Sequence, residues 1–274
     1  MIVTLEAKRL ERFLKTGRTC PMVIECEQNI PEDQDQLETG DNEVNSPRLM
    51  VVKTMGLPEL EERNLFCEFV GNVLARELGL FTPAPALITI SQEFAAAVNS
   101  RAKNERLSIN LREGVGVGCE YLHPLRPLTP KPSLTEEEIA QAAAIYAYDL
   151  LIQNPDRRGN KPNCAFYKNG LVAFDFELGF SFLLPILGPN REAWRVSQHG
   201  INSVHLFRPL LRNKAIEWKP FINQLAVLCQ TRLAMALDQL PEKWQDWAAI
   251  VQQHFLQASS KLEAFELELQ RSLL

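Results

Sequence analysis

The chain has 274 residues, of which 46% are hydrophobic and 23% are charged, so it can bury a sizeable core and has the composition of a soluble globular protein. Its net charge of −5 and its pI near 5.6 argue against direct, sequence-independent binding to nucleic acid, which requires a basic face. No apolar run approaches the roughly 20 residues that span a bilayer, and the charged N-terminus lacks the apolar core of a signal peptide, so we expect a cytoplasmic protein that does not bind membranes.

Several common enzyme motifs are missing from the sequence. The four histidines are scattered and form no HExxH pair, and no GxSxG, GxGxxG or Walker A motif is present. The six cysteines include no CxxC pair, so we expect buried reduced thiols rather than a zinc site or a disulfide scaffold.

The first half of the chain predicts short strands and one helix. The strand candidates are residues 20–28, 48–55, 83–90 and 112–122. The acidic segment 29–47 and the polar segment between the last two strands are predicted to be loops. An apolar stripe with helical spacing predicts a helix over residues 63–78, ended by Gly79; the stripe consists of Phe66, Phe69, Val70, Val73 and Leu74.

The second half begins after a proline-rich connector at residues 123–134. Thr135 and Glu138 form a capping-box pattern that predicts a helix over residues 136–152, and from about Phe221 the pattern is helical with a break near Pro241. We therefore expect an α+β protein with a β-rich lobe at residues 1–122, a mostly helical lobe at residues 123–274, and a cleft between them.

A hairpin is predicted over residues 163–176. Asn169-Gly170 is typical of a two-residue type I′ turn, in which Lys168 would pair with Leu171. That register brings Asn163 and Asp175 to the open end of the hairpin, roughly 7–8 Å apart, where both could reach one ion. Asn160 lies three residues further from the turn and is a second candidate for the same ion.

Two acids, one before this hairpin and one at its open end, have both structural and catalytic interpretations. Asp156 could cap a turn in Asn-Pro-Asp, and Asp175 could simply end a strand. Phosphoryl transfer, however, needs a carboxylate for the incoming hydroxyl and oxygen ligands for Mg²⁺, which this order of residues offers.

The segment NPDRRGNKPN, followed by a hairpin and FDF, resembles the catalytic centre of the HipA-like atypical kinases and, more distantly, of the type II phosphatidylinositol 4-kinases. Those kinases share a D-R-x-x-x-N loop and then a metal-binding Asp. Upstream, MVVKTMG is similar to their lysine strand, CEFVGNVLARELGL to their glutamate helix, and GVGCEYLHPL to their hinge. The resemblance covers roughly residues 17–182 and implies a two-lobed, protein-kinase-like fold.

The resemblance also implies roles for individual residues. Asp156 would be the catalytic base, Lys53 would hold the α- and β-phosphates of ATP, and Glu68 would orient Lys53. Asp175, together with Asn163 or Asn160, would bind Mg²⁺. The backbone of Glu120, Tyr121 and Leu122 would meet adenine, and Arg18 and Thr19, after Gly17, would lie in a turn that covers the phosphates.

Alternatives remain at several of these positions. Lys53 could extend to water, and helical periodicity alone does not choose between Glu61 and Glu68 as its partner. Arg157 and Arg158 could be a solvated pair or could contact phosphate. The spacing from the catalytic Asp to the metal-binding Asn is usually five, but it is four to Asn160 and seven to Asn163; Asp175 is followed by Phe-Glu, with glycine only at Gly179.

The resemblance predicts an ATP-dependent phosphotransferase, a HipA-like kinase domain that uses Mg²⁺ and transfers the γ-phosphoryl group to a hydroxyl on a protein or a small molecule. The alternative is an ATP-binding regulatory pseudokinase module without transfer activity. We expect Lys53, Asp156 and Asp175 to line one cleft.

Overall fold

The computed structural model describes residues 2–15, 18–28, 47–128, 133–185, 192–198 and 200–274, which form two compact units. The barrel unit comprises residues 2–69 and 84–121, and the helical unit comprises residues 70–83 and 122–274. The division falls inside one helix, α1 (Glu62–Glu77). The lobe boundary at residue 122 stays a prediction, and the contacts group residues 70–83 with the later part of the chain.

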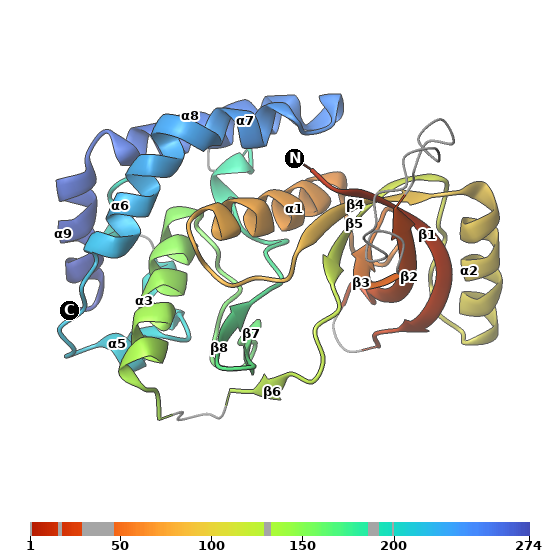
Figure 1. The fold of residues 1–274 in the computed structure, drawn as a ribbon, viewed down its shortest axis with the longest axis horizontal. Helices are drawn as coiled ribbons and strands as arrows, with labels where there is room; N and C mark the ends of the chain where they lie inside the picture. Colours follow the sequence, from red (N-terminus) through yellow and green to blue (C-terminus); the bar gives the residue numbers. More distant parts are fainter. Residues whose placement is uncertain (1, 16–17, 29–46, 129–132, 186–191, 199) are drawn as a thin grey trace, which may run out of the picture. The chain divides into compact units, whose positions relative to one another are not determined.

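Five strands close into a barrel in the barrel unit (Figure 1). They are β1 (Thr4–Phe13), β2 (Met22–Gln28), β3 (Arg48–Lys53), β4 (Pro85–Ile90) and β5 (Gly114–Glu120). Their order is β1-β2-β3-β5-β4, and β1 closes the ring by pairing in parallel with β4. Side chains buried from water form its core, among them Met22, Ile24, Val52 and Ile88.

Strand β1 was not expected from the sequence. Its pairing with β2 shifts register between Ala7 and Arg9 and again between Leu10 and Arg12. Such bulges interrupt the alternation of buried and exposed side chains, so the segment lacks the period-two pattern of a regular strand.

The prediction of a loop between the last two strands of this unit was wrong, because the structure has a helix there, α2 (Gln92–Asn104). Ser91 caps it by accepting a hydrogen bond of 3.1 Å from the Phe94 backbone N–H. Arg101 on α2 donates hydrogen bonds of 3.0 Å to the carbonyls of Leu10 and Glu11 on β1, which fixes the helix to the outside of the barrel (Figure 1). The acidic segment 29–47 lies outside the described residues, except for Pro47.

The helical unit is built around α3 (Glu136–Leu151), which the sequence predicted almost to the residue. Its capping box is confirmed, since Thr135 and Glu138 exchange hydrogen bonds between side chain and backbone. The helices that follow are α4 (Ile201–Val204), α5 (Arg208–Leu211), α6 (Lys219–Val227), α7 (Leu233–Asp238), α8 (Gln245–Ser259) and α9 (Leu262–Ser272).

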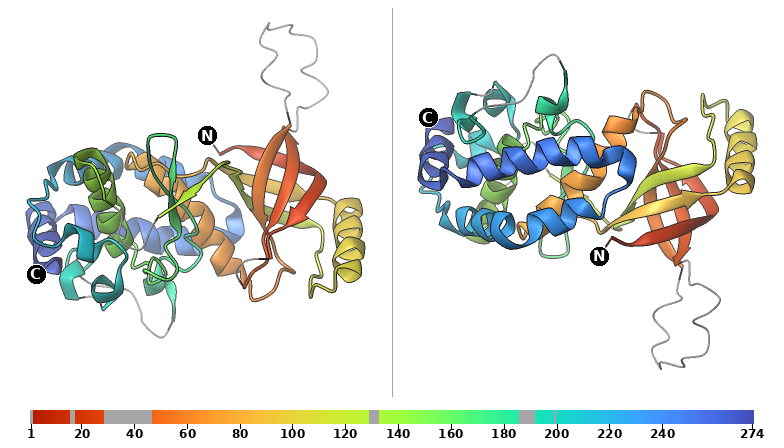
Figure 2. Two further views of the ribbon diagram at one scale, coloured as in Figure 1. Left: turned by 90° about the horizontal axis from the view of Figure 1, so that it is seen from below. Right: turned by 90° about the horizontal axis from the view of Figure 1, so that it is seen from above.

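Short irregular helices join these elements. They are the 3-10 turns η2 (Ser181–Leu183), η3 (Val196–Gln198) and η5 (Glu242–Trp244), and the π-helical turn η4 (Leu228–Arg232). The turn η4 joins α6 to α7 in one continuous helix, which lies beside α8 (Figure 2). The predicted break near Pro241 is confirmed, because α7 ends at Asp238 and α8 begins at Gln245. No helix in the described part of the chain combines the length and apolarity needed to span a membrane.

The hairpin is present, but its predicted register was wrong. Strands β7 (Cys164–Tyr167) and β8 (Gly170–Ala173) pair with Tyr167 opposite Gly170, so Lys168 and Asn169 form the turn. The left-handed backbone falls on Lys168, with φ of 51°, and not on Gly170.

Two features of the helical unit account for the observed register. It pairs Ala165 with Val172, and both are buried in one apolar cluster with Leu122. The Leu171 backbone N–H also donates a hydrogen bond of 2.8 Å to Gln141 on α3. Strand β6 (Arg126–Pro127) pairs with β7 and completes a three-stranded sheet. At the open end of the hairpin, the Phe174 N–H donates to the Asn163 carbonyl at 3.0 Å.

Candidate active site

Lys53 and Glu68 form a buried ion pair in the barrel unit. Lys53 is the last residue of β3, and its Nζ lies 3.0 Å from Oε2 of Glu68 on α1, with only 8% and 6% of the two side chains exposed. The rival acid, Glu61, is exposed and precedes the helix. Removing two charges from water costs several kcal/mol per ion, so a buried pair is weak evidence for stability and better evidence for a functional site.

The segment predicted to cover the phosphates is only partly described, because Gly17 lies outside the described residues. Arg18 is exposed, with a guanidinium nitrogen 3.9 Å from the Glu59 carboxylate, whereas Thr19 is buried. An exposed ion pair of this kind contributes little energy, so Arg18 can exchange partners easily.

The segment predicted to meet adenine has two of its backbone donors already engaged. The Glu120 N–H donates to the Ala84 carbonyl at 2.9 Å, and the Tyr121 N–H donates to the Leu49 carbonyl at 2.8 Å. Leu122 belongs to the helical unit, where its side chain is buried with Ala165 and Val172. An adenine ring would therefore need other backbone groups of this segment than these two N–H groups.

Asp156 lies in the loop after α3, in the helical unit, and is 9% exposed. Its backbone N–H donates to the Asn154 side chain at 3.1 Å, which fixes the loop locally. Asn163 donates its Nδ2 to Oδ2 of Asp156 at 3.0 Å. The amide carbonyl of Asn163 is thereby left to accept from, or coordinate, another group. Asn160 is exposed and has no such contact with Asp156 in the described structure, so the geometry favours Asn163 over Asn160.

Lys161 reaches the same acids and was not singled out from the sequence. Its Nζ donates to Oδ2 of Asp156 in a close contact and lies 3.7 Å from Oδ2 of Asp175. Partial burial acts to lower the pKa of Lys161, but the hydrogen bond to Asp156 and the charges of Asp175 and Glu177 raise it above its ordinary value. Lys161 is therefore an ammonium ion at the centre of the predicted catalytic loop.

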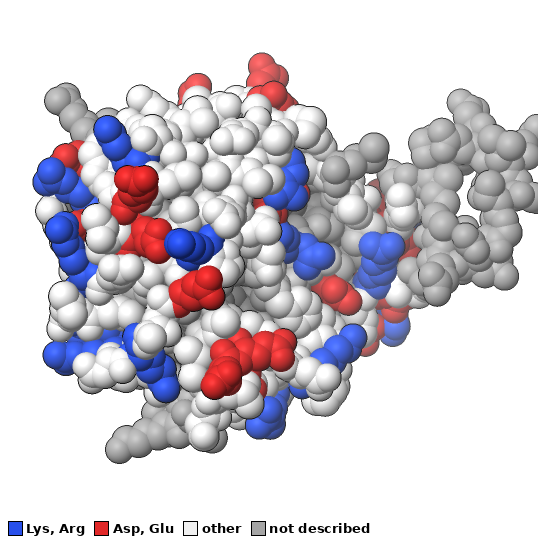
Figure 3. Space-filling view, turned by 60° about the vertical axis from the view of Figure 1, so that its left-hand side comes forward, with Lys and Arg blue, Asp and Glu red and all other residues white. Residues whose placement is uncertain are grey.

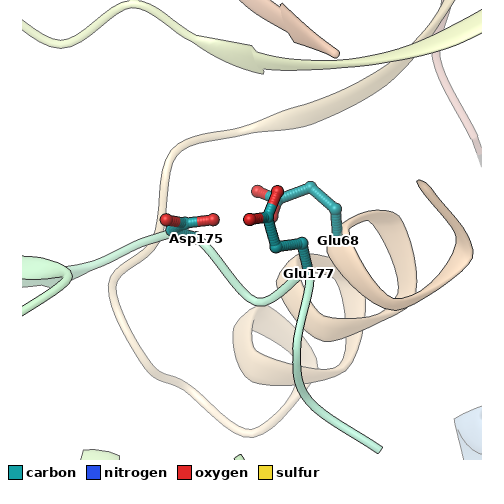
Figure 4. Close-up of side chains that lie close together, drawn as sticks. All are labelled: Glu68, Asp175 and Glu177. Atoms are coloured by element: carbon teal, nitrogen blue, oxygen red, sulfur yellow. The ribbon is translucent and has the colours of Figure 1, made fainter. Parts of the chain in front are cut away.

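A second acid accompanies Asp175. Figure 4 shows Asp175 and Glu177 on the segment that follows β8, and Glu68 on α1. Carboxylate oxygens of Asp175 and Glu177 lie within 4.8 Å of one another, and Glu177 is buried. Carboxylate and amide oxygens are hard donors of the kind that Mg²⁺ prefers, so Asp175, Glu177 and Asn163 fit that ion chemically. Glu177 could have been identified from the sequence, because it is an acid only two residues after the predicted metal ligand Asp175.

The backbone at these positions is strained. Asn163 and Asp175 have φ of 44° and 62°, in the left-handed region, which Asn and Asp adopt more readily than other non-glycine residues do. Each such residue costs on the order of 1 kcal/mol or more and persists only where its surroundings hold it in place. The surroundings of these two predicted metal ligands therefore hold each of them in a defined backbone conformation.

A buried network of charged and polar side chains holds the loop that follows α3 in place. Asp149 on α3 and Arg157 are joined by two hydrogen bonds, one of 3.3 Å and one closer, and neither side chain is exposed. His205 Nε2 donates to Asp149 at 3.0 Å while its Nδ1 accepts from the Phe207 N–H at 3.1 Å, so the ring is neutral. Burial, in keeping with this, lowers the pKa of His205.

Arg157 is buried, so it is neither solvated nor accessible to a phosphate group. Both interpretations of it from the sequence were therefore wrong. Besides Asp149, its guanidinium donates to the carbonyls of Asn163, in a close contact, and of Phe174, at 3.4 Å. It thus joins α3 to the two residues that adjoin β7 and β8 at the open end of the hairpin. The missed signal was Asp149, a lone acid in the apolar run AAAIYAYDLLI. The other arginine, Arg158, is exposed, and its Nε donates to the Pro155 carbonyl at 2.6 Å.

Helix α1 approaches the residue after Asp175 very closely. A Cβ atom added to Gly71 would lie 2.4 Å from Cβ of Phe176. Tyr148 on α3 supports the contact, since its hydroxyl donates to the Gly71 carbonyl at 2.8 Å and its ring packs edge-on against Phe176. Glycine at position 71 is therefore required for the packing that fixes Phe176.

We expect Gly71→Ala to destabilise the helical unit. Overpacking at this distance should cost about 3 kcal/mol, which exceeds the gain of about 1 kcal/mol from replacing glycine in a helix. Equilibrium urea unfolding measures the net loss, expected to be about 2 kcal/mol. Gly159→Ala is the matched control, because nothing lies within 4 Å of a Cβ added there. Equal stability of the two variants would contradict the packing described.

Charges of both signs are interspersed on the face of the molecule drawn in Figure 3. Two arginines of the helical unit have partners close by: Arg195 pairs with Glu192 at 3.0 Å, and Arg208 donates to the Ser272 carbonyl at 2.9 Å. The face drawn in Figure 3 is therefore of mixed charge.

Comparison with known proteins adds two findings. A family model described as HipA-like kinase matches residues 43–272. The chain is similar to the crystal structure of a Helicobacter pylori proinflammatory kinase, CtkA, with 11% sequence identity, a TM-score of 0.53, and 98% of this chain and 99% of that chain covered. At that identity the likeness concerns the fold, with strands in the N-terminal part and helices in the C-terminal part. No match was found among curated proteins.

Proposed function

Because the chain belongs to the HipA-like kinase family, we propose that it transfers the γ-phosphoryl group of ATP, with Mg²⁺, to a hydroxyl group on a protein. The observation that carries the proposal is the buried ion pair between Lys53 and Glu68. A lysine held at the end of a strand by a buried carboxylate is a fixed cation suited to polyphosphate, whereas a lysine that merely covers a barrel would extend to water.

The roles proposed for the helical unit follow from its contacts. Asp156 accepts the proton of the incoming hydroxyl through Oδ1, because its Oδ2 accepts hydrogen bonds from Asn163 and Lys161. Asp175 and the amide oxygen of Asn163 would hold Mg²⁺, with Glu177 beside them. When bound, the ion would neutralise charge on the phosphates. Arg157 keeps these residues in place without touching the substrate.

One observation favours the alternative of an ATP-binding pseudokinase. Two donors, Lys161 and Asn163, share Oδ2 of Asp156, and hydrogen bonds to a carboxylate weaken it as a base. Incubation with labelled ATP and Mg²⁺, alone and with candidate acceptor proteins, separates the two functions. Labelled protein supports transfer, label on a small molecule changes the acceptor class, and binding without any labelled product supports the pseudokinase.

Nucleotide binding itself is tested by thermal unfolding with Mg-ATP. A ligand at a hundredfold excess over Kd stabilises a protein by about 2.7 kcal/mol, and we expect such a shift for the wild type. Asp175→Ala should show little of it, because a metal ligand is lost, and Lys53→Met should show less than the wild type. Each variant is compared with its own nucleotide-free melt, since Lys53→Met also leaves Glu68 buried without its cation.

The matched control for Asp175→Ala is Asp246→Ala, which removes an exposed acid in the first turn of α8. It should keep the full Mg-ATP shift. A wild type without any shift at millimolar Mg-ATP would contradict the proposed function, as would an unchanged shift in both Asp175→Ala and Lys53→Met.

A further inference from the structure

Lys161 is positioned by its backbone and not only by its side-chain contacts. Its N–H donates to the Arg158 carbonyl at 3.1 Å, and the Arg158 N–H donates back to the Lys161 carbonyl at 3.0 Å. The next residue, Pro162, restricts the backbone further because its ring fixes φ. The stem of Lys161 therefore starts from a tight turn, and its ammonium reaches Asp156 in a close contact and Asp175 at 3.7 Å.

The ammonium and the proposed divalent ion share one carboxylate, that of Asp175. Oδ2 of Asp175, which faces Lys161, belongs to the carboxylate proposed to hold Mg²⁺. Two cations at one carboxylate repel each other strongly at distances of a few Å in a partly buried site. Metal binding at Asp175 thus requires that Lys161 move away or that its charge be balanced by an anion.

We propose that Lys161 is a tethered cation that competes with divalent metal for Asp175, so that the metal binds more tightly together with the phosphates of a nucleotide than alone. The phosphates bring the negative charge that draws the ammonium off Asp175 and frees this carboxylate for the ion. Lys161 then stays beside Asp156, where it can face the phosphate oxygens. This inference rests on the proposed function for the identity of the anion, but the competition between Lys161 and metal is a property of the nucleotide-free protein.

The competition can be measured without catalysis, by titrating the nucleotide-free full chain with Mn²⁺ and following free Mn²⁺ by electron paramagnetic resonance. We expect Lys161→Met to bind Mn²⁺ at least about tenfold more tightly than the wild type, which corresponds to roughly 1.4 kcal/mol. Lys168→Met is the matched control, because Lys168 is an exposed lysine at the turn between β7 and β8 and its ammonium packs over the Tyr167 ring. It should bind Mn²⁺ as the wild type does.

A double variant locates the gain in affinity. Adding Asp175→Ala to Lys161→Met should abolish it, because the metal would lose its carboxylate. Lys161→Gln serves as a second test if the Met variant folds poorly. Equal Mn²⁺ affinity in the wild type and both Lys161 variants, or absence of Mn²⁺ binding in all of them, overturns the inference, and so does a gain that survives removal of Asp175.

A non-hydrolysable ATP analogue separates this inference from the proposed function. With the analogue bound, the wild type and Lys161→Met should differ in Mn²⁺ affinity by less than threefold. If the analogue binds neither protein while the nucleotide-free difference persists, the proposed function fails and the competition stands. If the analogue binds and the nucleotide-free difference is absent, the proposed function stands and the competition is refuted.

Discussion

Asp156→Asn should reduce phosphoryl transfer by about 100- to 10,000-fold, the range typical of a positioned general base. The substitution keeps the shape of the side chain and removes the charge that accepts the hydroxyl proton. The Mg-ATP stabilisation should persist, because Asp175 and Lys53 are unchanged. The two measurements are the initial rate of label transfer from ATP and the thermal shift with Mg-ATP.

The control for Asp156→Asn is the same substitution at Asp238, an exposed acid at the end of α7. Asp238→Asn should transfer phosphate at the wild-type rate. If Asp156→Asn also retains that rate, Asp156 is not the base. A variant that loses both transfer and the Mg-ATP shift would instead indicate a structural role for Asp156, since Asn163 and Lys161 both depend on its carboxylate.

Arg157→Met should destabilise the helical unit by about 3–5 kcal/mol, the cost of breaking a buried ion pair from one side. The lost guanidinium leaves Asp149 buried among weaker donors and removes a donor from the Asn163 carbonyl. Intrinsic fluorescence during urea unfolding is a suitable measurement, because all four tryptophans lie in this unit, at positions 194, 218, 244 and 247.

Arg158→Met provides a neighbouring control with the same change of side chain. Arg158 is exposed, so its loss should alter the free energy of unfolding by only about 0.5 kcal/mol. Equal stability of the two variants would mean that the pair between Arg157 and Asp149 contributes nothing measurable. Preserved stability with lost transfer in Arg157→Met would mean that Arg157 orients the loop without supporting the fold.

The elements that the sequence predicted share strong local signals. Strand β3 is β-branched at its centre, helix α3 carries a complete capping box, and Gly79, with φ of 82°, follows the last turn of α1. Helix α2 buries one Phe, one Val and two Ala side chains, a stripe too small to stand out from a polar segment. Its signal was the cap Ser91. Strand β1 was missed because bulges break its alternation.

The residues of the candidate site also divide into those that local sequence signals could identify and those whose roles depend on tertiary packing. The order of Lys53, Glu68, Asp156 and Asp175 along the chain could be recognised because motif spacing is a local property. Spacing does not reveal side-chain direction, which at Lys161 depends on the tight turn with Arg158. The buried role of Arg157 depends on Asp149 and on the hairpin register, and that register is set by tertiary packing around Ala165.

The closed barrel has a consequence for the order of folding. Its last seam joins Leu5 on β1 to Ile88 on β4, so β1 must wait for a partner made much later. At about 5–20 residues per second, ribosomal synthesis of the intervening chain takes roughly 4–17 s. Throughout that interval one edge of β1 exposes unpaired backbone groups, which is the condition that favours aggregation. The nascent barrel unit is therefore expected to depend on co-translational chaperones more than the helical unit, whose α3 and hairpin are neighbours in sequence.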